Sequence, residues 1–410
     1  MTATVVVGAG LAGLAAALDL AKARVPVTLL ERRAFPGGRS YSFTDASGET
    51  IDNGQHVFLE CCTAYRAFLD EIGAADLVTL QPRADVPFVD LRTGVTSRLR
   101  ESWLPAPFHF LPSILRFKPL AWRERCAILK AGSAMRKEAG SDAESLGAWL
   151  RKHGQSDDAI RLFWDPAVVS ILNERVDKVS AAQGIFVMKT GFFAGKAAAR
   201  VGIAEVPLGE IASRAVEKIR SLGGTVEFNR KLDTLPAGPV ITAVPAKQLL
   251  DLVPDHPFFA PVRAMETSPI VNLHYFFDAP VNAPRFFACV GGKLQWVFTK
   301  GARVTVSQSA AREIIDRPNA ELERELLEEL RKAIPGLPAP RRCVVVRERE
   351  ATFVASPGAK ARRLPCATPF PTLFLAGEWT EGEWPSTMEA AVRSGKRAAA
   401  ELIRKFHLAD

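Results

Sequence analysis

The chain has 410 residues, of which 48% are hydrophobic and 24% are charged. This composition excludes a disordered protein, and the length predicts two domains rather than one small module. The formal net charge of +8 suits an anionic partner. Because no nucleic-acid-binding motif is present, we expect no nucleic acid and either a lipid surface or no partner.

Cysteine usage and the chain's start predict the compartment. Six cysteines occur without C-x-x-C spacing, which predicts free thiols in a reducing cytoplasm and no metal site. A strand is predicted from Thr4, which leaves no room for a signal peptide. No run of about eighteen uncharged apolar residues occurs, so no membrane-spanning helix is predicted.

The first 31 residues predict a strand, a tight turn, a helix and a second strand. The β-branched run 4–7 leads into Gly8-Ala9-Gly10-Leu11-Ala12-Gly13, and an alanine- and leucine-rich helix then runs to about Arg24. In this context the three glycines predict a dinucleotide site, because they permit the turn, the approach of a pyrophosphate and close helix packing. Glu31 ends the second strand, where its carboxylate can accept hydrogen bonds from a ribose diol and disfavours NADP.

The residues after Glu31 favour a flavin over a nicotinamide. They read Arg32-Arg33-Ala34-Phe35-Pro36-Gly37-Gly38-Arg39. This pattern resembles that of the amine oxidase and carotenoid desaturase flavoproteins. The resemblance implies FAD, with Gly38 crossing the pyrophosphate and Arg39 adding positive charge beside it. A solvated basic turn is the simpler alternative.

A second motif, Asn53-Gly54-Gln55-His56, lies in the segment 49–58. It resembles the hydroxysqualene dehydroxylases of bacterial hopanoid synthesis, and in the superfamily this segment runs under the flavin ring. His56 is therefore either a structural histidine or a catalytic proton-transfer group.

Two acids inside apolar sequence are further catalytic candidates. Asp165 follows Trp164 and precedes Pro166, where a helix is predicted to end, and Glu174 precedes Arg175. Burial could raise the pKa of either carboxyl group and let it donate a proton. The alternative is that these acids cap helices or pair with arginine.

The C-terminal region predicts a strand ending in Gly377-Glu378 and a helix that begins near Ser386-Thr387-Met388. Ser386 and Glu389 have the spacing of a capping box. The family resemblance implies that these residues contact the flavin, that Glu378 bonds its ribityl region, and that Val226 contacts the adenine end.

Residues 103–137 mix aromatic and aliphatic side chains with seven Lys or Arg residues and a single acid, Glu124. This composition suits the headgroup boundary of an anionic bilayer. We expect peripheral contact with the inner face of the cell membrane, although a core hairpin with a basic face is the alternative. The aromatic strands predicted at 271–277 and 294–298 suit the walls of an apolar tunnel.

The predicted fold is α/β, with a split Rossmann-type FAD-binding domain and an inserted α+β substrate domain, as in amine oxidases and phytoene desaturases. The FAD-binding parts are 1–75, 201–250 and 361–410, and the substrate parts are 76–200 and 251–360.

The resemblance implies reduction of hydroxysqualene to squalene, with hydride from the reduced flavin quenching a substrate cation after water is lost. It also implies interplay with the synthase that forms hydroxysqualene. The alternatives are a carotenoid or phytoene desaturase, an amine oxidase, and a non-catalytic prenyl carrier. The aromatic cage of amine oxidases includes a tyrosine near the terminal helix, and Thr387 stands there instead.

Overall fold

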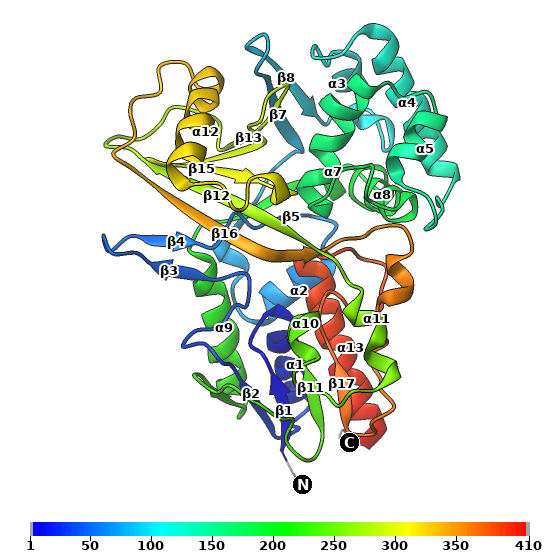
Figure 1. Ribbon diagram of the computed structural model, residues 1–410, viewed down its shortest axis with the longest axis vertical. Coiled ribbons are helices and arrows are strands. Elements are labelled where there is room, and N and C mark those ends of the chain that lie inside the picture. Colours follow the sequence, from blue (N-terminus) through cyan, green and yellow to red (C-terminus); the bar gives the residue numbers. More distant parts are fainter. Residues whose placement is uncertain (1–2, 407–410) are drawn as a thin grey trace.

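The computed structural model describes residues 3–406, which form two lobes along the long axis of the molecule (Figure 1). One lobe contains a five-stranded sheet in the order β10-β2-β1-β11-β17, with all neighbours parallel. Its strands are β1 (Thr4–Val7), β2 (Val27–Leu30), β10 (Thr225–Glu227), β11 (Val240–Thr242) and β17 (Leu373–Leu375). Apart from the edge strand β10, these strands are largely apolar because both faces of a parallel sheet are buried.

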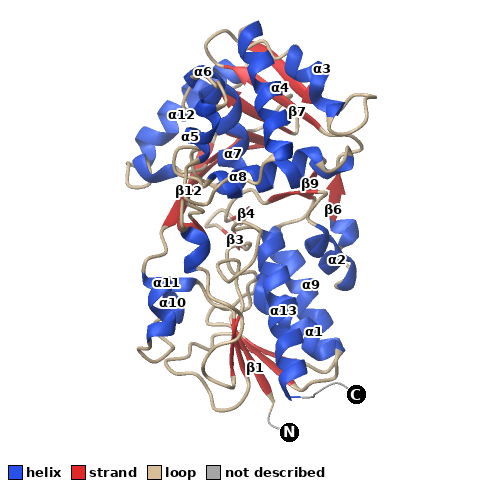
Figure 2. Cartoon of the chain, turned by 90° about the vertical axis from the view of Figure 1, so that its right-hand side faces the viewer, coloured by secondary structure: helices blue, strands red, loops and turns tan. Residues whose placement is uncertain are grey.

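Three helices pack side by side next to this sheet (Figure 2). They are α1 (Leu11–Lys22), α9 (Leu208–Ser221) and α13 (Met388–Phe406). Helix α1 is buried almost all round, which explains its small side chains. It meets α13 so closely that a Cβ atom on Gly395 would lie 2.0 Å from the carbonyl oxygen of Ala12.

The other lobe contains a seven-stranded sheet in the order β16-β12-β15-β14-β13-β7-β8, antiparallel except between β13 and β7. Its strands are β7 (Asp85–Asp90), β8 (Val95–Arg100), β12 (Thr267–Phe276), β13 (Phe286–Val290), β14 (Trp296–Lys300), β15 (Arg303–Gln308) and β16 (Arg342–Phe353). Helix α12 (Asn319–Ala333) packs on one face through Leu322, Leu326 and Leu330.

A helical layer completes this lobe and lies at the end of the molecule away from the parallel sheet (Figures 1 and 2). Its helices are α3 (Leu111–Leu115), α4 (Trp122–Lys137), α5 (Leu146–Lys152), α6 (Asp157–Ala159), α7 (Asp165–Leu172) and α8 (Ala181–Met188). The hairpin β3 (Ser42–Thr44) and β4 (Thr50–Asp52) lies where the lobes meet, as does the small sheet of β5 (Val57–Leu59), β9 (Val201–Ala204) and β6 (Val78–Leu80).

The predicted architecture is confirmed, because strands of the parallel sheet come from three separate parts of the chain. The domain boundaries stay a prediction. The predicted helix end at Trp164–Pro166 is wrong, since a π-helical turn over Ile160–Trp164 continues directly into α7. Pro166 lies in the first turn of α7, directly after the π-helical turn.

Candidate active site

The first site element is a cradle of bare backbone between β1 and α1. Gly8 has φ +101°, and a Cβ atom on Gly13 would lie 1.8 Å from the carbonyl oxygen of Gly8. A Cβ atom on Gly38 would lie 2.9 Å from Cα of Gly10. The two predicted glycine loops are therefore adjacent, and no side chain fits between them.

The N-terminus of α1 opens onto this cradle. Gly10 provides no side-chain cap, and the first turn of α1 has no acidic residue. The positive end of the helix is thus available to an anion, which fits a pyrophosphate. Together with the adjacent Gly-Gly-Arg loop, this geometry fits the FAD predicted from the sequence.

Glu31 lies at the edge of the cradle and is buried. Its carboxylate accepts hydrogen bonds from the backbone N–H of Ala9 at 2.8 Å and of Arg33 at 2.9 Å. The side chain of Arg32 is exposed, whereas Arg33 donates to the carbonyl oxygen of Gly38 at 3.0 Å. Glu31 therefore links the first glycine loop to Arg33, and Arg33, which the sequence did not single out, holds the second glycine loop.

Arg39 of the second glycine loop and Glu378, which follows β17, form an ion pair of 2.6 Å. Gly377 leads into this pair with φ +142°. The sequence did not single out Arg363, whose guanidinium donates to the carbonyl oxygens of Glu378, Thr380, Gly382 and Trp384. Burial lowers the pKa of Arg363 to about 10. Arg363 therefore holds the loop that carries Glu378.

The capping box predicted at Ser386 and Glu389 is wrong. Thr387 caps α13, because its hydroxyl accepts from the N–H of Ala390 at 3.2 Å, and Met388 begins the helix. Glu389 is fully buried and accepts instead from the N–H groups of Ala64 and Tyr65. These groups begin helix α2 (Thr63–Glu71), which has no side-chain cap of its own.

Val226 lies in β10 beside Leu29 of β2. Its carbonyl oxygen accepts a hydrogen bond from Arg220 at 3.0 Å. The predicted contact between Val226 and the adenine stays a prediction.

The motif Asn53–His56 bridges the lobes. The Asn53 side chain donates to the carbonyl oxygen of Arg39 at 3.0 Å and to Glu348 at 3.2 Å. Asn272 of β12 donates to the carbonyl oxygen of Asn53 at 3.2 Å. A Cβ atom on Gly54 would lie 2.6 Å from Nδ2 of Asn272, so a larger residue there would displace the Asn272 side chain. The motif thus rests on the seven-stranded sheet.

His56 is held by its own loop. Its Nδ1 lies 3.2 Å from the carbonyl oxygen of Gly54, and because a carbonyl only accepts, Nδ1 carries the proton. Burial lowers the pKa of His56 below its usual value. At neutral pH its Nε2 atom is consequently an acceptor, so His56 must first bind a proton before it can act as an acid.

Asp165 and Glu174 lie in a separate network around the end of α7. Asp165 accepts from the N–H of Val176 at 2.9 Å, and burial raises its pKa. Glu174 is buried, pairs with Arg312 and accepts from the N–H of Arg175. Neither carboxylate shares a hydrogen-bond partner with His56, and the three candidates are not brought together.

The sheet face toward the Asn53–His56 motif carries two rows of side chains. Antiparallel pairing aligns Phe286, Phe298, Thr305 and His274 across four strands. The next row aligns Trp296, Ser307 and Asn272 in the same way. Directly opposed residues point to the same face, so both rows are aromatic on β14 and polar at β12. On β13 the first row has Phe286 and the second has Ala288.

A pocket of about 130 Å³ borders both the motif and these rows, and its lining includes Gln55, Phe298 and Thr305. The sequence did not single out Asn272, His274 or Glu348. Asn272 and His274 could have been found from the alternation of polar and apolar residues, because they are the only polar residues between Ile270 and Tyr275.

Comparison with known proteins identifies the family. A family model described as flavin containing amine oxidoreductase matches residues 11–403. The hydroxysqualene dehydroxylase of Rhodopseudomonas palustris is 30% identical over 426 residues, which cover 96% of this chain and 96% of that protein. The 15-cis-phytoene desaturase of Narcissus pseudonarcissus is 25% identical over 98% of this chain and 80% of that protein.

Among solved structures, a putrescine oxidase with bound putrescine has a TM-score of 0.74 and 18% identity, covering 98% of this chain and 99% of that one. This likeness supports the fold alone. The match to the family model and the identity to the dehydroxylase both span almost the whole chain. The chain therefore belongs to the flavin-containing amine oxidoreductase family and, within it, to the group of the hydroxysqualene dehydroxylases.

Proposed function

We propose that this FAD-dependent oxidoreductase reduces hydroxysqualene to squalene. The substrate exchanges its hydroxyl group for hydrogen, so the reaction consumes one hydride equivalent and one proton and releases water. Reduced FAD supplies the hydride equivalent when it is bound. The chain's task is to bind the flavin, bring a long apolar substrate beside it, exclude bulk water and provide the proton.

One observation carries this proposal: the aromatic sheet rows lie beside the Asn53–His56 motif. Trp296 and Phe298 stack at 6.5 Å between ring centroids, and Phe298 stacks with Phe286 at 6.3 Å. Both stacks are on the face that meets the flavin-binding lobe. Such a surface suits a hydrocarbon, and its aromatic faces also stabilise a cation that forms when the hydroxyl group leaves.

An apolar route connects these rows with the helical layer. Trp296 and Val86 belong both to the apolar cluster around the rows and to the larger cluster formed by α3 to α8. Phe110, just before α3, lies 6.3 Å from Phe192 of the larger cluster. The clusters thus offer continuous hydrocarbon contact from residues 103–137 to the flavin side of the sheet.

His56, Asp165 and Glu174 remain the proposed acids. Asp165 has the raised pKa that suits a donor, whereas His56 lies in the motif next to the substrate rows. Glu174 is already paired with Arg312. The variants Asp165→Asn and His56→Gln distinguish these two candidates. Hydride transfer should be slow at every pH in the variant that lacks the proton donor.

The direction of electron flow tests the proposal. The anaerobic, reduced holoenzyme is mixed with hydroxysqualene, and the oxidised holoenzyme is mixed with phytoene, while flavin absorbance is followed. We expect hydroxysqualene to reoxidise the flavin and phytoene to leave it oxidised. Flavin reduction by phytoene, without reoxidation by hydroxysqualene, would replace the proposal with desaturation.

We further propose that residues 103–137 dock on an anionic lipid surface. Trp103, Phe108 and Trp122 are 85%, 52% and 60% exposed, which is unusual for aromatic residues. Among residues 3–406, no ion pair involves any of the seven Lys or Arg side chains of this segment. No helix within this described range is long and apolar enough to cross a membrane.

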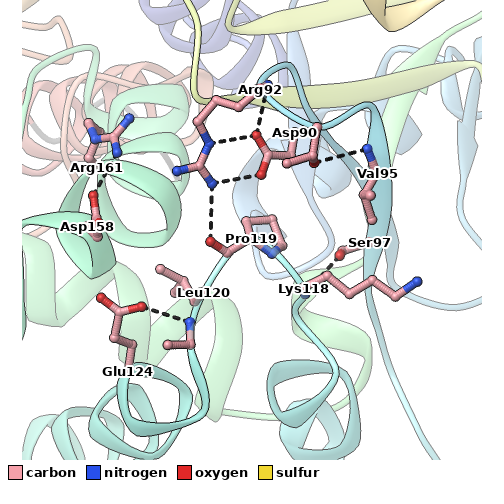
Figure 3. Close-up of polar contacts among 12 residues, drawn as sticks. Asp90, Arg92, Val95, Ser97, Lys118, Pro119, Leu120, Glu124, Asp158 and Arg161 are labelled. Atoms are coloured by element: carbon pink, nitrogen blue, oxygen red, sulfur yellow. Dashed lines mark hydrogen bonds and ion pairs between the residues drawn. The ribbon is translucent and has the colours of Figure 1, made fainter.

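The surface is held firmly by the hairpin β7–β8 (Figure 3). Arg92 forms an ion pair of 2.7 Å with Asp90 and donates to the carbonyl oxygen of Pro119 at 3.2 Å, which fixes the turn between α3 and α4. Glu124, the only acid of the segment, accepts from the N–H of Ala121 at 2.9 Å and so caps α4. Arg125 donates to the carbonyl oxygens of Leu115 and Leu120, whereas the exposed Arg123 and Lys130 are available to lipid phosphates.

Sedimentation with anionic vesicles tests this docking. Arg123 and Lys130 are exposed and lie two turns apart on one face of α4. Neutralising both to Gln should weaken binding about 30-fold at low salt, because each surface cation contributes about 1 kcal/mol. The control is Lys218→Gln, an exposed cation on α9. Equal binding by the double variant would contradict the docking surface, as would binding unaffected by salt.

If the docking holds, hydroxysqualene would reach this enzyme through the bilayer. Interplay with the synthase that forms hydroxysqualene, at the cytoplasmic face of the same membrane, follows as part of the proposal. The substrate is too apolar to cross water efficiently between two enzymes.

A further inference from the structure

The flavin-facing side of β12 contains two buried polar atoms that bond to nothing. Asn272 and His274 are each 1% exposed. Oδ1 of Asn272 and Nε2 of His274 have no hydrogen-bond partner among the described residues. An unpaired polar atom in the interior is costly, so two on neighbouring positions of one strand face call for a ligand.

The orientation of both side chains is fixed by their other polar atoms. Nδ2 of Asn272 donates to the carbonyl oxygen of Asn53, which leaves Oδ1 as the free acceptor. Nδ1 of His274 lies 3.0 Å from the hydroxyl of Thr305, which leaves Nε2 free. The neutral ring exposes either a donor or an acceptor at Nε2, depending on which way the Thr305 hydroxyl points.

The surroundings of Asn272 and His274 suit a ligand that has one polar group on an apolar chain. Asn272 and His274 lie in the rows that begin with Trp296, Phe298 and Phe286, and Val346 and Val344 of β16 continue these rows on the other side. The opposite face of β12 is apolar and packs on α12. The pocket bordered by Gln55, Phe298 and Thr305 lies next to this position, because Thr305 pairs with His274. Its remaining wall is mainly charged and includes Asp52, Glu205, Arg285, Lys300 and Arg303.

We propose that Asn272 and His274 bind the hydroxyl group of hydroxysqualene and so place the carbon–oxygen bond beside the Asn53–His56 motif. This inference rests on the proposed function and deepens it. Oδ1 of Asn272 accepts a hydrogen bond from the hydroxyl group, and Nε2 of His274, when it carries a proton, donates a hydrogen bond to the hydroxyl oxygen. Thr305 is a positioning residue, because it orients the His274 ring.

The charge state of His274 agrees with this role. Burial and the nearby Arg303 lower the pKa of His274 to about 3, so the ring is neutral throughout the physiological range. A neutral ring binds an uncharged alcohol without repelling the cation that remains after the hydroxyl group leaves.

Binding to the oxidised holoenzyme tests the inference without turnover, since oxidised flavin provides no hydride. The Kd values of hydroxysqualene and squalene are measured from the flavin absorbance change, and their ratio reports recognition of the hydroxyl group. The wild type should favour hydroxysqualene, and Asn272→Leu and His274→Phe should each reduce the ratio about 5- to 10-fold with little change in the Kd of squalene. His274→Gln, which keeps a polar group, should restore part of the preference.

Tyr275→Phe is the matched control. Tyr275 lies on the same strand but faces α12, where its hydroxyl donates to the carbonyl oxygen of Glu323 at 2.9 Å. It should keep the wild-type ratio. Thr305→Val preserves shape and provides a second test if a larger change unfolds the sheet, and it should lower the ratio by freeing the His274 ring.

The outcomes separate the inference from the proposed function. A wild-type preference for hydroxysqualene that survives in Asn272→Leu, His274→Phe and Thr305→Val overturns the hydroxyl site alone. A wild type that shows no preference, and whose reduced flavin hydroxysqualene does not reoxidise, overturns both.

Discussion

Replacing Glu389 tests how the flavin-side end of α13 is built. Its carboxylate is fully buried and accepts from Ala64 N–H at 3.0 Å, from Tyr65 N–H at 2.7 Å and from Arg393 Nε at 2.6 Å. In Glu389→Gln, the amide group places a donor against one of these donors and removes the charge that pairs with Arg393.

The expected loss of stability follows from these contacts. A hydrogen bond to a charged group contributes about 1.5–3 kcal/mol, and a carboxylate at a helix N-terminus adds about 0.3–1 kcal/mol. Glu389→Gln forfeits one such bond outright and weakens the others, so we expect a loss of about 3–5 kcal/mol. Urea unfolding of FAD-saturated protein, followed by circular dichroism, measures it.

Two neighbouring variants make this test specific. Ser386→Ala should change stability by less than about 0.5 kcal/mol, because the Ser386 side chain makes no hydrogen bond within residues 3–406. Thr387→Ala should cost about 1 kcal/mol as the true cap. The reasoning is refuted if Ser386→Ala costs more than Thr387→Ala, or if Glu389→Gln costs under about 1 kcal/mol.

Three more predictions concern the cradle and the buried histidine. Gly13→Ala should yield protein without flavin, because the new Cβ atom would lie 1.8 Å from the Gly8 carbonyl oxygen. The control Gly195→Ala has open space around the new Cβ atom and should purify with full flavin. Flavin absorbance retained by Gly13→Ala would contradict the cradle. Glu31→Ala removes the acceptor of two backbone N–H groups and should raise the Kd for FAD about tenfold or more, and an unchanged Kd in a fluorescence titration would exclude Glu31 from the site. Unfolded His274 has an ordinary pKa of about 6.5 and binds more protons than folded His274 between that pH and about 3, so stability falls as pH is lowered. Between pH 7 and pH 5 this one group should lower the free energy of unfolding by about 2 kcal/mol, and urea unfolding of His274→Gln should lack this decrease. An equal pH dependence of stability in both proteins would refute the lowered pKa of His274.

The elements that follow from local rules could be predicted from sequence. The turn from β1 to α1 requires glycine at Gly8 because its φ is +101°, and at Gly13 because a Cβ atom there would lie 1.8 Å from the Gly8 carbonyl oxygen. Both requirements are local, and the sequence pattern shows them. The role of Glu389 could not be predicted, because its partners at the start of α2 lie 325 and 324 positions away in the chain. The Ser386–Glu389 spacing is a valid local pattern, but the Glu389 carboxylate accepts hydrogen bonds from the N-terminus of helix α2 instead.

The same distinction applies to the substrate-facing residues. Asn272 and His274 acquire their role from the ladder that aligns four strands and from the loop at Asn53, 219 positions away. The alternation in β12 indicated which residues share a face, but not what that face meets. Asp165 and Glu174 interrupt apolar sequence, and a hydrogen bond to Asp165 and an ion pair of Glu174 within the substrate lobe already account for their burial.

The reaction itself is the most direct test of the central claim. The holoenzyme is reduced anaerobically in D₂O and mixed with hydroxysqualene, and the products are analysed by mass spectrometry. We predict squalene carrying one deuterium atom, formed in a 1:1 ratio with reoxidised flavin. Flavin that stays reduced, with no squalene formed, would contradict the claim that this chain exchanges the hydroxyl group of hydroxysqualene for hydrogen.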